Sequence, residues 1–319
     1  MLKNAFLFAI STLLACLTVE AGLRILGYTP LTLLESTDRG WSRPDPALGW
    51  VNRAGRFASS EAGNAEMNFD SAGRRATPPG AAGAPRIDMI GDSITQGYGV
   101  TDPETFVWRL AAARPDLSFV NLGVGGYGTH QSLLVMEGRG TDPPALYVYG
   151  FFGDHRFRNV AHLTWIRALR DAEGRNVVPP HVTLAGERLA RHPGGAVEPW
   201  PLETASALVK ELHRAWMRLV FRARSDQSDA ALRALLIEMR DTARAQNAGF
   251  LMLLLADAPG WLPEFLRTQA IASADCRVPE FERDPSLRVG GVGHPTGARH
   301  AAWAECLAPA LDAALAQRK

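Results

Sequence analysis

Apolar runs alternate with helically spaced segments from residue 84 onward, and this pattern predicts strands alternating with helices. Short apolar runs that end at glycine or polar residues are typical of buried strands, and they cover residues 86–90, 117–122, 145–152, 249–255 and, more briefly, 269–274. Helical spacing covers residues 105–113, 131 onward, 229–246 and 298–316. Because parallel strands need crossover connections, we expect an α/β fold: a three-layer α/β/α sandwich around a parallel sheet of about five strands.

The first 26 residues form a separate apolar segment. Residues 5–19 carry no charge, Lys3 precedes them, and Glu20 and Arg24 follow. This run is shorter than the roughly 20 residues of a spanning helix, but apolar positions continue to Leu26. We expect an uncleaved transmembrane helix that contacts the membrane, with a cytoplasmic N-terminus and the rest of the chain outside the cytoplasm.

Three other interpretations of this segment stay open. A cleaved secretory signal has the same basic start and apolar stretch. Residues 13–16 (Leu-Leu-Ala-Cys) also resemble a lipoprotein cleavage box. The third interpretation is a buried helix of a soluble protein; the other two agree with the anchor on an extracytoplasmic body.

The chain divides into three predicted parts. Residues 1–26 are the anchor or signal, residues 27–83 a membrane-proximal extension that packs irregularly, and residues 84–319 the α/β domain. An Arg- and Pro-rich insertion, 153–228, interrupts this domain and contains a possible hairpin at 181–191. Such an insertion could cover the active edge of the sheet and select substrate.

Composition and charge exclude several classes of protein. The 319 residues are 46% apolar and 21% charged, which is typical of a globular chain. Lys and Arg number 34 and Asp and Glu 33, and the net charge of +1 gives no sign of a nucleic-acid partner. The histidines lack metal-ligand spacing, and the glycine motif lacks dinucleotide-binding spacing. We therefore expect neither a metal nor a cofactor.

Cys276 and Cys306 are the two cysteines beyond the N-terminal segment. An oxidising compartment would permit them to form a disulfide. Two separate buried thiols are the alternative, because a sequence gives no geometry.

Three polar or glycine-rich motifs follow the predicted strands, where parallel α/β sheets bind their ligands. Ser93 lies in GDSITQG directly after the first strand, where a helix N-terminus supplies free N–H donors. Four glycines lie within NLGVGGYG, residues 121–128, after the second strand. His294 stands in a loop before the terminal helix.

These motifs, in this order, resemble those of the SGNH (GDSL-type) hydrolases over about residues 84–316. The apolar segment ending in Glu20 and Arg24 is similar to that of membrane-anchored bacterial members. The resemblance implies a flavodoxin-like SGNH fold and a serine esterase on the periplasmic side of an inner membrane. Its substrate would be an acyl ester, with an O-acetyl or short acyl group on a glycan or lipid.

The resemblance also implies residue roles. Ser93 matches the nucleophile that forms the acyl-enzyme, and its N–H would be one oxyanion donor. Gly126 matches the glycine whose N–H is the second donor. His294, in the HP motif, matches the general base that takes the Ser93 proton and returns it to the leaving alcohol.

Two departures from the family pattern concern this machinery. The third block normally reads Gly-x-Asn-Asp, with an oxyanion-donating Asn, but here Gly153 stands at that position, or Asp154 if the register slips by one. An ionised Asp cannot donate a hydrogen bond. His155, Arg158 or Asn159 could enter the oxyanion hole instead, or form a solvated loop.

The second departure is the missing acid of the Asp-x-x-His motif, where Gly291 stands. A backbone carbonyl, Asp154 or Asp284 could orient His294 in its place. Because of both departures, two alternatives to the esterase stay open: an O-acyltransferase with the same nucleophile, and a catalytically degenerate binding or assembly protein.

Overall fold

The computed structural model describes residues 2–32, 40–59, 65–171, 174–186, 188–278, 284–290 and 293–317. Contacts divide the chain into two units, each described here by itself. The anchor unit comprises Met1–Asp38, Ala161–Val178 and Gly195–Asp226, and the sheet unit comprises Arg39–Val160, Pro179–Gly194 and Gln227–Lys319. This division differs from the sequence-based one, because it groups much of the predicted insertion with the N-terminal helix.

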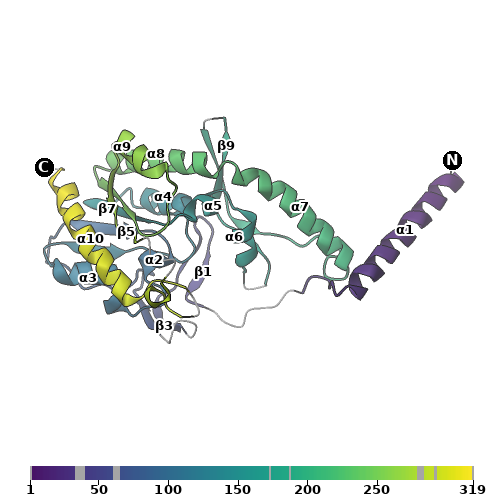
Figure 1. The fold of residues 1–319 in the computed structure, drawn as a ribbon, viewed down its shortest axis with the longest axis horizontal. Coiled ribbons are helices and arrows are strands. Elements are labelled where there is room, and N and C mark those ends of the chain that lie inside the picture. The colour runs from purple at the N-terminus through teal and green to yellow at the C-terminus, as the bar shows by residue number, and fades with distance from the viewer. Residues whose placement is uncertain are drawn as a thin grey trace. The chain divides into compact units, whose positions relative to one another are not determined.

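The sheet unit is built on five parallel strands (Figure 1). Their order across the sheet is β13 (Ala272–Asp275), β12 (Gly249–Leu254), β7 (Leu146–Phe151), β5 (Arg86–Ile90) and β6 (Ser118–Asn121). The predicted parallel sheet is thereby confirmed. All six residues of the central β7 are buried, as expected of a strand that is covered on both faces.

Helices cover both faces of this sheet and complete the three predicted layers. Helices α3 (Phe106–Ala113) and α10 (Gly297–Ala316) pack on one face, where Phe106 and Trp303 are fully buried. The other face holds α4 (Thr129–Gly138), α8 (Ser228–Ala245) and α9 (Leu262–Thr268). Leu232, Leu235, Leu236 and Met239 of α8 are all fully buried, which explains the strong helical periodicity of this segment.

Residues 40–83 belong to the sheet unit and are more regular than expected. They form two antiparallel ladders, β1 (Ser42–Asp45) with β2 (Gly49–Asn52) and β3 (Gly55–Ser59) with β4 (Ala65–Phe69). Arg75 then forms an antiparallel bridge to Asn121 of the edge strand β6. The expectation of irregular packing is therefore wrong for this segment. The predicted hairpin is confirmed as β9 (His181–Ala185) and β10 (Arg188–His192).

The anchor unit contains α1 (Leu2–Ile25), α6 (Leu163–Ala168) and α7 (Ala207–Ser225), with a short ladder of β8 (Val177–Val178) and β11 (Gly195–Ala196). Residues Lys3–Ile25 are long and apolar enough to cross a membrane or to serve as a signal sequence. None of this apolar window is buried among the described residues, which argues against the buried helix of a soluble protein.

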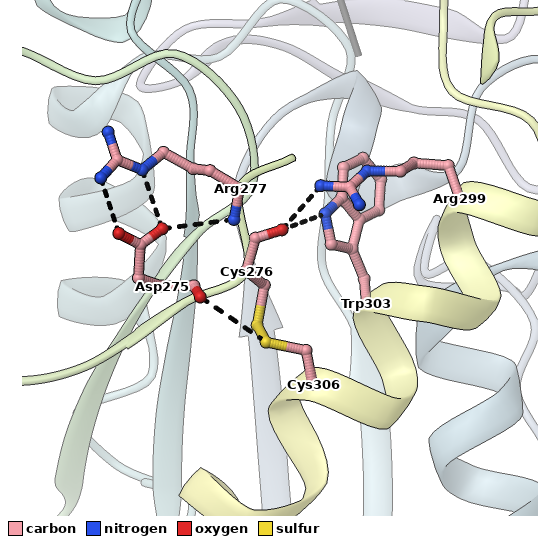
Figure 2. The surroundings of a disulfide bond; sticks show 6 residues. All are labelled: Asp275, Cys276, Arg277, Arg299, Trp303 and Cys306. Atoms are coloured by element: carbon pink, nitrogen blue, oxygen red, sulfur yellow. Dashed lines mark hydrogen bonds and ion pairs between the residues drawn. A yellow bond between two sulfur atoms is a disulfide. The ribbon is translucent and has the colours of Figure 1, made fainter. Parts of the chain in front are cut away.

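A disulfide joins Cys276, just after β13, to Cys306 in α10 (Figure 2). The two Cα atoms are 5.8 Å apart. The Cys276 carbonyl oxygen accepts hydrogen bonds from Arg299 Nη2 at 2.6 Å and Trp303 Nε1 at 3.1 Å. Of the two possibilities left open for these cysteines, the disulfide is confirmed, and it fixes the helix that directly follows His294.

Because three imidazoles are buried, we expect the free energy of unfolding to decrease as the pH is lowered. Burial lowers the pKa of His130 and of His300 to about 3 each, and burial lowers that of His155 despite Asp92 beside it. In the unfolded chain, imidazoles bind protons near pH 6.5, whereas these buried imidazoles stay neutral at that pH. The free energy of unfolding is therefore highest above pH 6.5 and decreases as the pH falls below it. We expect up to about 1.4 kcal/mol of lost stability per imidazole and pH unit.

Urea unfolding of the detergent-solubilised chain between pH 7 and 5 measures this loss. His300→Gln should flatten the pH dependence relative to wild type. Equal free energies of unfolding at pH 7 and pH 5 would contradict the prediction.

Candidate active site

The turn between β5 and α2 (Ser93–Gln96) places Ser93 at a helix N-terminus beyond a strand end. Gly91 has a φ of +154°, and a Cβ there would lie 2.3 Å from Thr95 Oγ1 and 2.9 Å from Gly150 O, so only glycine fits. Asp92 caps the helix by accepting the Ile94 N–H at 2.9 Å. This glycine and this cap together fix the backbone on both sides of Ser93.

His294 lies against Ser93, although 201 positions separate them in the sequence. The Nε2 atom of His294 is 2.9 Å from Ser93 Oγ. The His294 carbonyl oxygen accepts the Val289 N–H at 2.6 Å, and the Tyr98 ring packs edge-on at 4.9 Å. A neutral imidazole with its proton on Nδ1 can accept the hydroxyl proton at Nε2, as a general base requires.

The glycine-rich turn after β6 lies beside Ser93. A Cβ on Gly125 would approach Ser93 Cβ to 3.9 Å, and Gly126 has a φ of +85°. Trp50 Nε1 donates to Gly125 O at 2.8 Å, and Val124 N donates to Gly91 O at 3.1 Å. The turn that carries the predicted oxyanion donor is therefore held next to Ser93 from two sides.

The third-block position has a physical reason for being glycine. A Cβ on Gly153 would lie 2.8 Å from Asp257 Oδ2 and 2.9 Å from Asp257 O. Any side chain at 153, asparagine included, would need the chain at Asp257 to move. Asp154 is exposed at the start of α5 (His155–Asn159). The structure therefore supports neither position as the side-chain oxyanion donor.

The structure supports neither of the two carboxylates that the sequence suggested as the acid that orients His294. Asp154 is exposed, and the Asp284 carboxylate accepts the Ser286 N–H at 2.9 Å and the Ser286 hydroxyl at 2.7 Å. These contacts use Asp284 as the cap of a short 3-10 helix, Pro285–Leu287. Gly291 of the family motif lies outside the described residues.

A buried ionic cluster surrounds Asp92, the residue before Ser93. Arg158 Nη1 donates to Asp92 Oδ2 at 2.9 Å and to Tyr127 O at 3.0 Å, and His155 Nε2 lies 3.2 Å from Asp92 Oδ2. Burial alone would raise the pKa of Asp92, but His155, Arg158 and the Ile94 N–H outweigh it and hold the pKa well below its usual range. Asp92 is therefore a carboxylate, and Arg158 links it to the glycine-rich turn.

Polar side chains extend this cluster into the interior. His155 Nδ1 lies 2.7 Å from Tyr149 OH, which donates to Thr129 Oγ1 at 2.9 Å. Asn159 Nδ2 donates to the same Thr129 hydroxyl at 3.0 Å. His155 and Asn159 are fully or almost fully buried in these contacts. Of the three suggested replacements for the missing asparagine, His155 and Arg158 both contact Asp92, and Arg158 also donates to the glycine-rich turn at Tyr127 O.

Arg158 is therefore expected to be a positioning residue. Arg158→Gln should lower kcat by about 10²-fold, since displacements of about 1 Å in a reacting group have effects of this size. KM should change little, and Arg158→Lys should restore part of kcat, because a lysine retains the charge beside Asp92. Steady-state kinetics on a chromogenic acyl ester measures both constants.

Arg156→Gln is the matched control on the same helix. Arg156 Nη1 pairs with Asp229 at 3.1 Å and does not belong to the Asp92 cluster, so this variant should keep its activity. Equal loss of activity in both variants would mean that α5 is disturbed as a whole, and would contradict the positioning role.

Sequence reasoning missed residues from the first ladders that support the site. Asn52 Nδ2 donates to Gly123 O at 3.0 Å, while Asn52 Oδ1 accepts from Gln96 Nε2 at 2.8 Å. Asn52 thus ties the helix that begins at Ser93 to the glycine-rich turn, and Trp50, two positions earlier, contacts the same turn. No motif marks either residue, and only the folded chain brings them to the site.

Comparison with known proteins gives matches among solved structures alone. No protein-family model and no curated protein matches the chain. It is similar to a member of the lipolytic protein G-D-S-L family from Veillonella parvula DSM 2008, with 14% identity, 70% of this chain and 96% of that chain covered, and a TM-score of 0.40.

Two further similar structures are TesA and an esterase. TesA has 17% identity, with 72% of this chain and 98% of that chain covered and a TM-score of 0.41. The psychrotrophic esterase EstA from Pseudoalteromonas sp. has 10% identity, with 72% and 97% covered and a TM-score of 0.42. Because these identities are low, we infer function below from the Ser93–His294 contact.

Proposed function

We propose that the chain is a serine esterase of the SGNH type that hydrolyses an acyl ester through an acyl-enzyme on Ser93. The observation that carries the proposal is the 2.9 Å approach of His294 Nε2 to Ser93 Oγ. A nucleophile and a base within hydrogen-bond reach are the minimal arrangement for acyl transfer to serine.

In the first half of the reaction, Ser93 Oγ attacks the ester carbonyl carbon while His294 Nε2 takes the hydroxyl proton. The carbonyl oxygen becomes an oxyanion, for which the N–H groups of Ser93 and Gly126 are the proposed donors. Collapse of this intermediate breaks the ester C–O bond, and His294 passes its proton to the leaving alcohol.

In the second half, water replaces the alcohol. His294 takes a proton from the water, whose oxygen attacks the acyl carbon and displaces Ser93 Oγ. The proton returns to Ser93, and the products are the free carboxylic acid and the original enzyme. A glycan hydroxyl in place of water would give transfer instead, so the ratio of transfer to hydrolysis with an added glycan acceptor distinguishes the two outcomes.

The proposed placement is extracytoplasmic and membrane-bound. The helix Lys3–Ile25 has the length and composition of a membrane span, and the Cys276–Cys306 disulfide fits an oxidising compartment. An enzyme held at a membrane meets surface glycans and lipids, which supports an O-acetyl or short acyl group on one of these as substrate.

Active-site labelling tests the proposal. A fluorophosphonate probe should label the detergent-solubilised wild-type chain, because it phosphonylates only an activated serine. Ser93→Ala should abolish labelling, while the exposed control Ser71→Ala should leave it intact. Absence of labelling in a folded wild-type chain would favour the degenerate binding protein and reject the esterase.

A further inference from the structure

Helix α7 of the anchor unit has two apolar faces: one is buried inside the unit, and the other is largely exposed, although Trp216 on it also contacts Trp200 with ring centroids 5.8 Å apart. His213, Met217 and Phe221 are buried, with Met217 and Phe221 packed near Ile166 of α6. Another face carries Leu212, Trp216 and Leu219, which are 53%, 44% and 75% exposed. Their spacing of four and three residues places them in one stripe along the helix.

A row of arginines lies about a third of a turn around the helix from this exposed stripe. Arg214, Arg218 and Arg222 are all exposed and recur every fourth residue, so they also share a face. The whole helix has five basic residues and one acidic residue. Burial lowers the pKa of Arg167 in α6, and Arg218 and Arg214 lower it further, so positive charge gathers at this part of the unit.

The N-terminus of α7 is attached to the end of the candidate membrane span. The Glu20 carboxylate of α1 accepts hydrogen bonds from Ser206 Oγ at 2.8 Å, Ala207 N at 3.1 Å and Leu208 N at 2.8 Å. Arg24 Nη2 donates to Ala205 O at 2.7 Å. The two helices meet at this corner (Figure 1).

The attachment point sets the depth at which α7 begins. Glu20 lies five residues before the end of α1 at Ile25, about 7 Å along a helix axis. In a bilayer spanned by α1, α7 would therefore start at the level of the headgroups and outer acyl chains. Interfacial helices are buried to a depth of about 5–10 Å.

We propose that α7 is an interfacial helix that docks on the membrane surface, with Leu212, Trp216 and Leu219 against the acyl-chain boundary and Arg214, Arg218 and Arg222 on anionic phospholipid headgroups. Guanidinium groups bind phosphate in a bidentate manner, and tryptophan favours the membrane–water interface. The proposal holds whether or not the chain is an esterase.

Two observations favour a lipid surface over a second copy of the chain as the occupant. The helix that carries the stripe is attached at its N-terminus to a helix that has the length and composition of a membrane span. A symmetric pairing of two α7 helices would bring two strongly cationic helices together, whereas an anionic leaflet neutralises their charge.

Site-specific fluorescence on the full chain tests the docking. Leu212→Cys in a Cys16→Ser background is labelled with the environment-sensitive dye NBD and reconstituted in phosphatidylcholine vesicles with or without phosphatidylglycerol. In vesicles that contain phosphatidylglycerol, we expect the NBD emission to shift to the blue and to be quenched by doxyl lipids. The dye should also be protected from iodide that is present both inside and outside the vesicles. The control Ala245→Cys, at an exposed position of α8, should stay accessible to iodide.

The arginine row is tested in the same vesicles. Replacing Arg214, Arg218 and Arg222 together by Gln should lower the ratio of docked to undocked helix about 100-fold, since each arginine near an anionic surface contributes roughly a factor of five. Iodide quenching of the 212 label equal to that of the 245 control would overturn the proposal. The 212 label could instead be protected from iodide only at high protein density and independently of phosphatidylglycerol. That result would show that a second copy of the chain covers the stripe, and it would also overturn the proposal.

Discussion

Replacing His294 by glutamine lowers kcat for an acyl ester by about 10³-fold or more, the largest effect expected of any single substitution outside Ser93. Glutamine can still reach the Ser93 hydroxyl, but its side chain cannot take up the proton. In the proposed mechanism, the 2.9 Å contact of Nε2 with Ser93 Oγ allows His294 to accept the proton in the attack and to donate it to the leaving alcohol. Both steps lose their catalyst in this variant.

Single-turnover kinetics separates this effect from substrate binding. The burst of released alcohol should slow with little change in the concentration that half-saturates it, because the imidazole acts in the transition state. His192→Gln is the control, since this imidazole pairs with Thr183 in the β9–β10 hairpin. A His294→Gln chain with near-normal kcat would show that another group is the base.

The fold was predictable from the sequence because local patterns determine its main elements. Buried strands such as Leu146–Phe151 appear as continuous apolar runs, and α8 shows its buried stripe every three to four residues. The contact between Ser93 and His294 was predictable for another reason: each lies in a short motif. The GDS turn needs a glycine at 91, and that steric requirement leaves a mark in the sequence.

Contacts between distant segments, in contrast, produce no local pattern in the sequence. Asp257, more than a hundred positions away, leaves no room for a side chain at Gly153. From the sequence alone, the missing asparagine therefore looked like the loss of a catalytic residue rather than a packing requirement. The contact of Asn52 with Gly123 and the attachment of Glu20 to the start of α7 also join distant segments. Polar residues in turns are common, and only the tertiary contacts show which of them support the site.

Arg75 is the clearest of these long-range contacts, and it holds the segment that follows the nucleophile helix. Its side chain is fully buried and forms an ion pair with Asp102, whose side chain is 7% exposed. The guanidinium also donates to Gly97 O at 3.1 Å and to Val100 O at 2.8 Å. Asp102 in turn accepts from Asn68 Nδ2 at 2.6 Å, so the pair joins β4 to the end of α2.

Arg75→Met should reduce the free energy of unfolding by about 3–5 kcal/mol. Methionine fills much of the space, but it leaves the Asp102 carboxylate buried without its cation, and an uncompensated buried charge has this cost. The carbonyl oxygens of Gly97 and Val100 also lose this donor. Urea unfolding of the solubilised chain at pH 7 measures the change.

Two further variants show whether the buried charge is the cause. Arg74→Met removes the neighbouring arginine, whose ion pair with Asp70 is 39% exposed on both sides, and should change stability by less than about 1 kcal/mol. Arg75→Met combined with Asp102→Leu removes both charges and should recover part of the loss, because an apolar pair of similar volume can replace a buried ion pair. If the double variant is no more stable than Arg75→Met alone, the loss comes from the hydrogen bonds to Gly97 and Val100, and the charge argument fails.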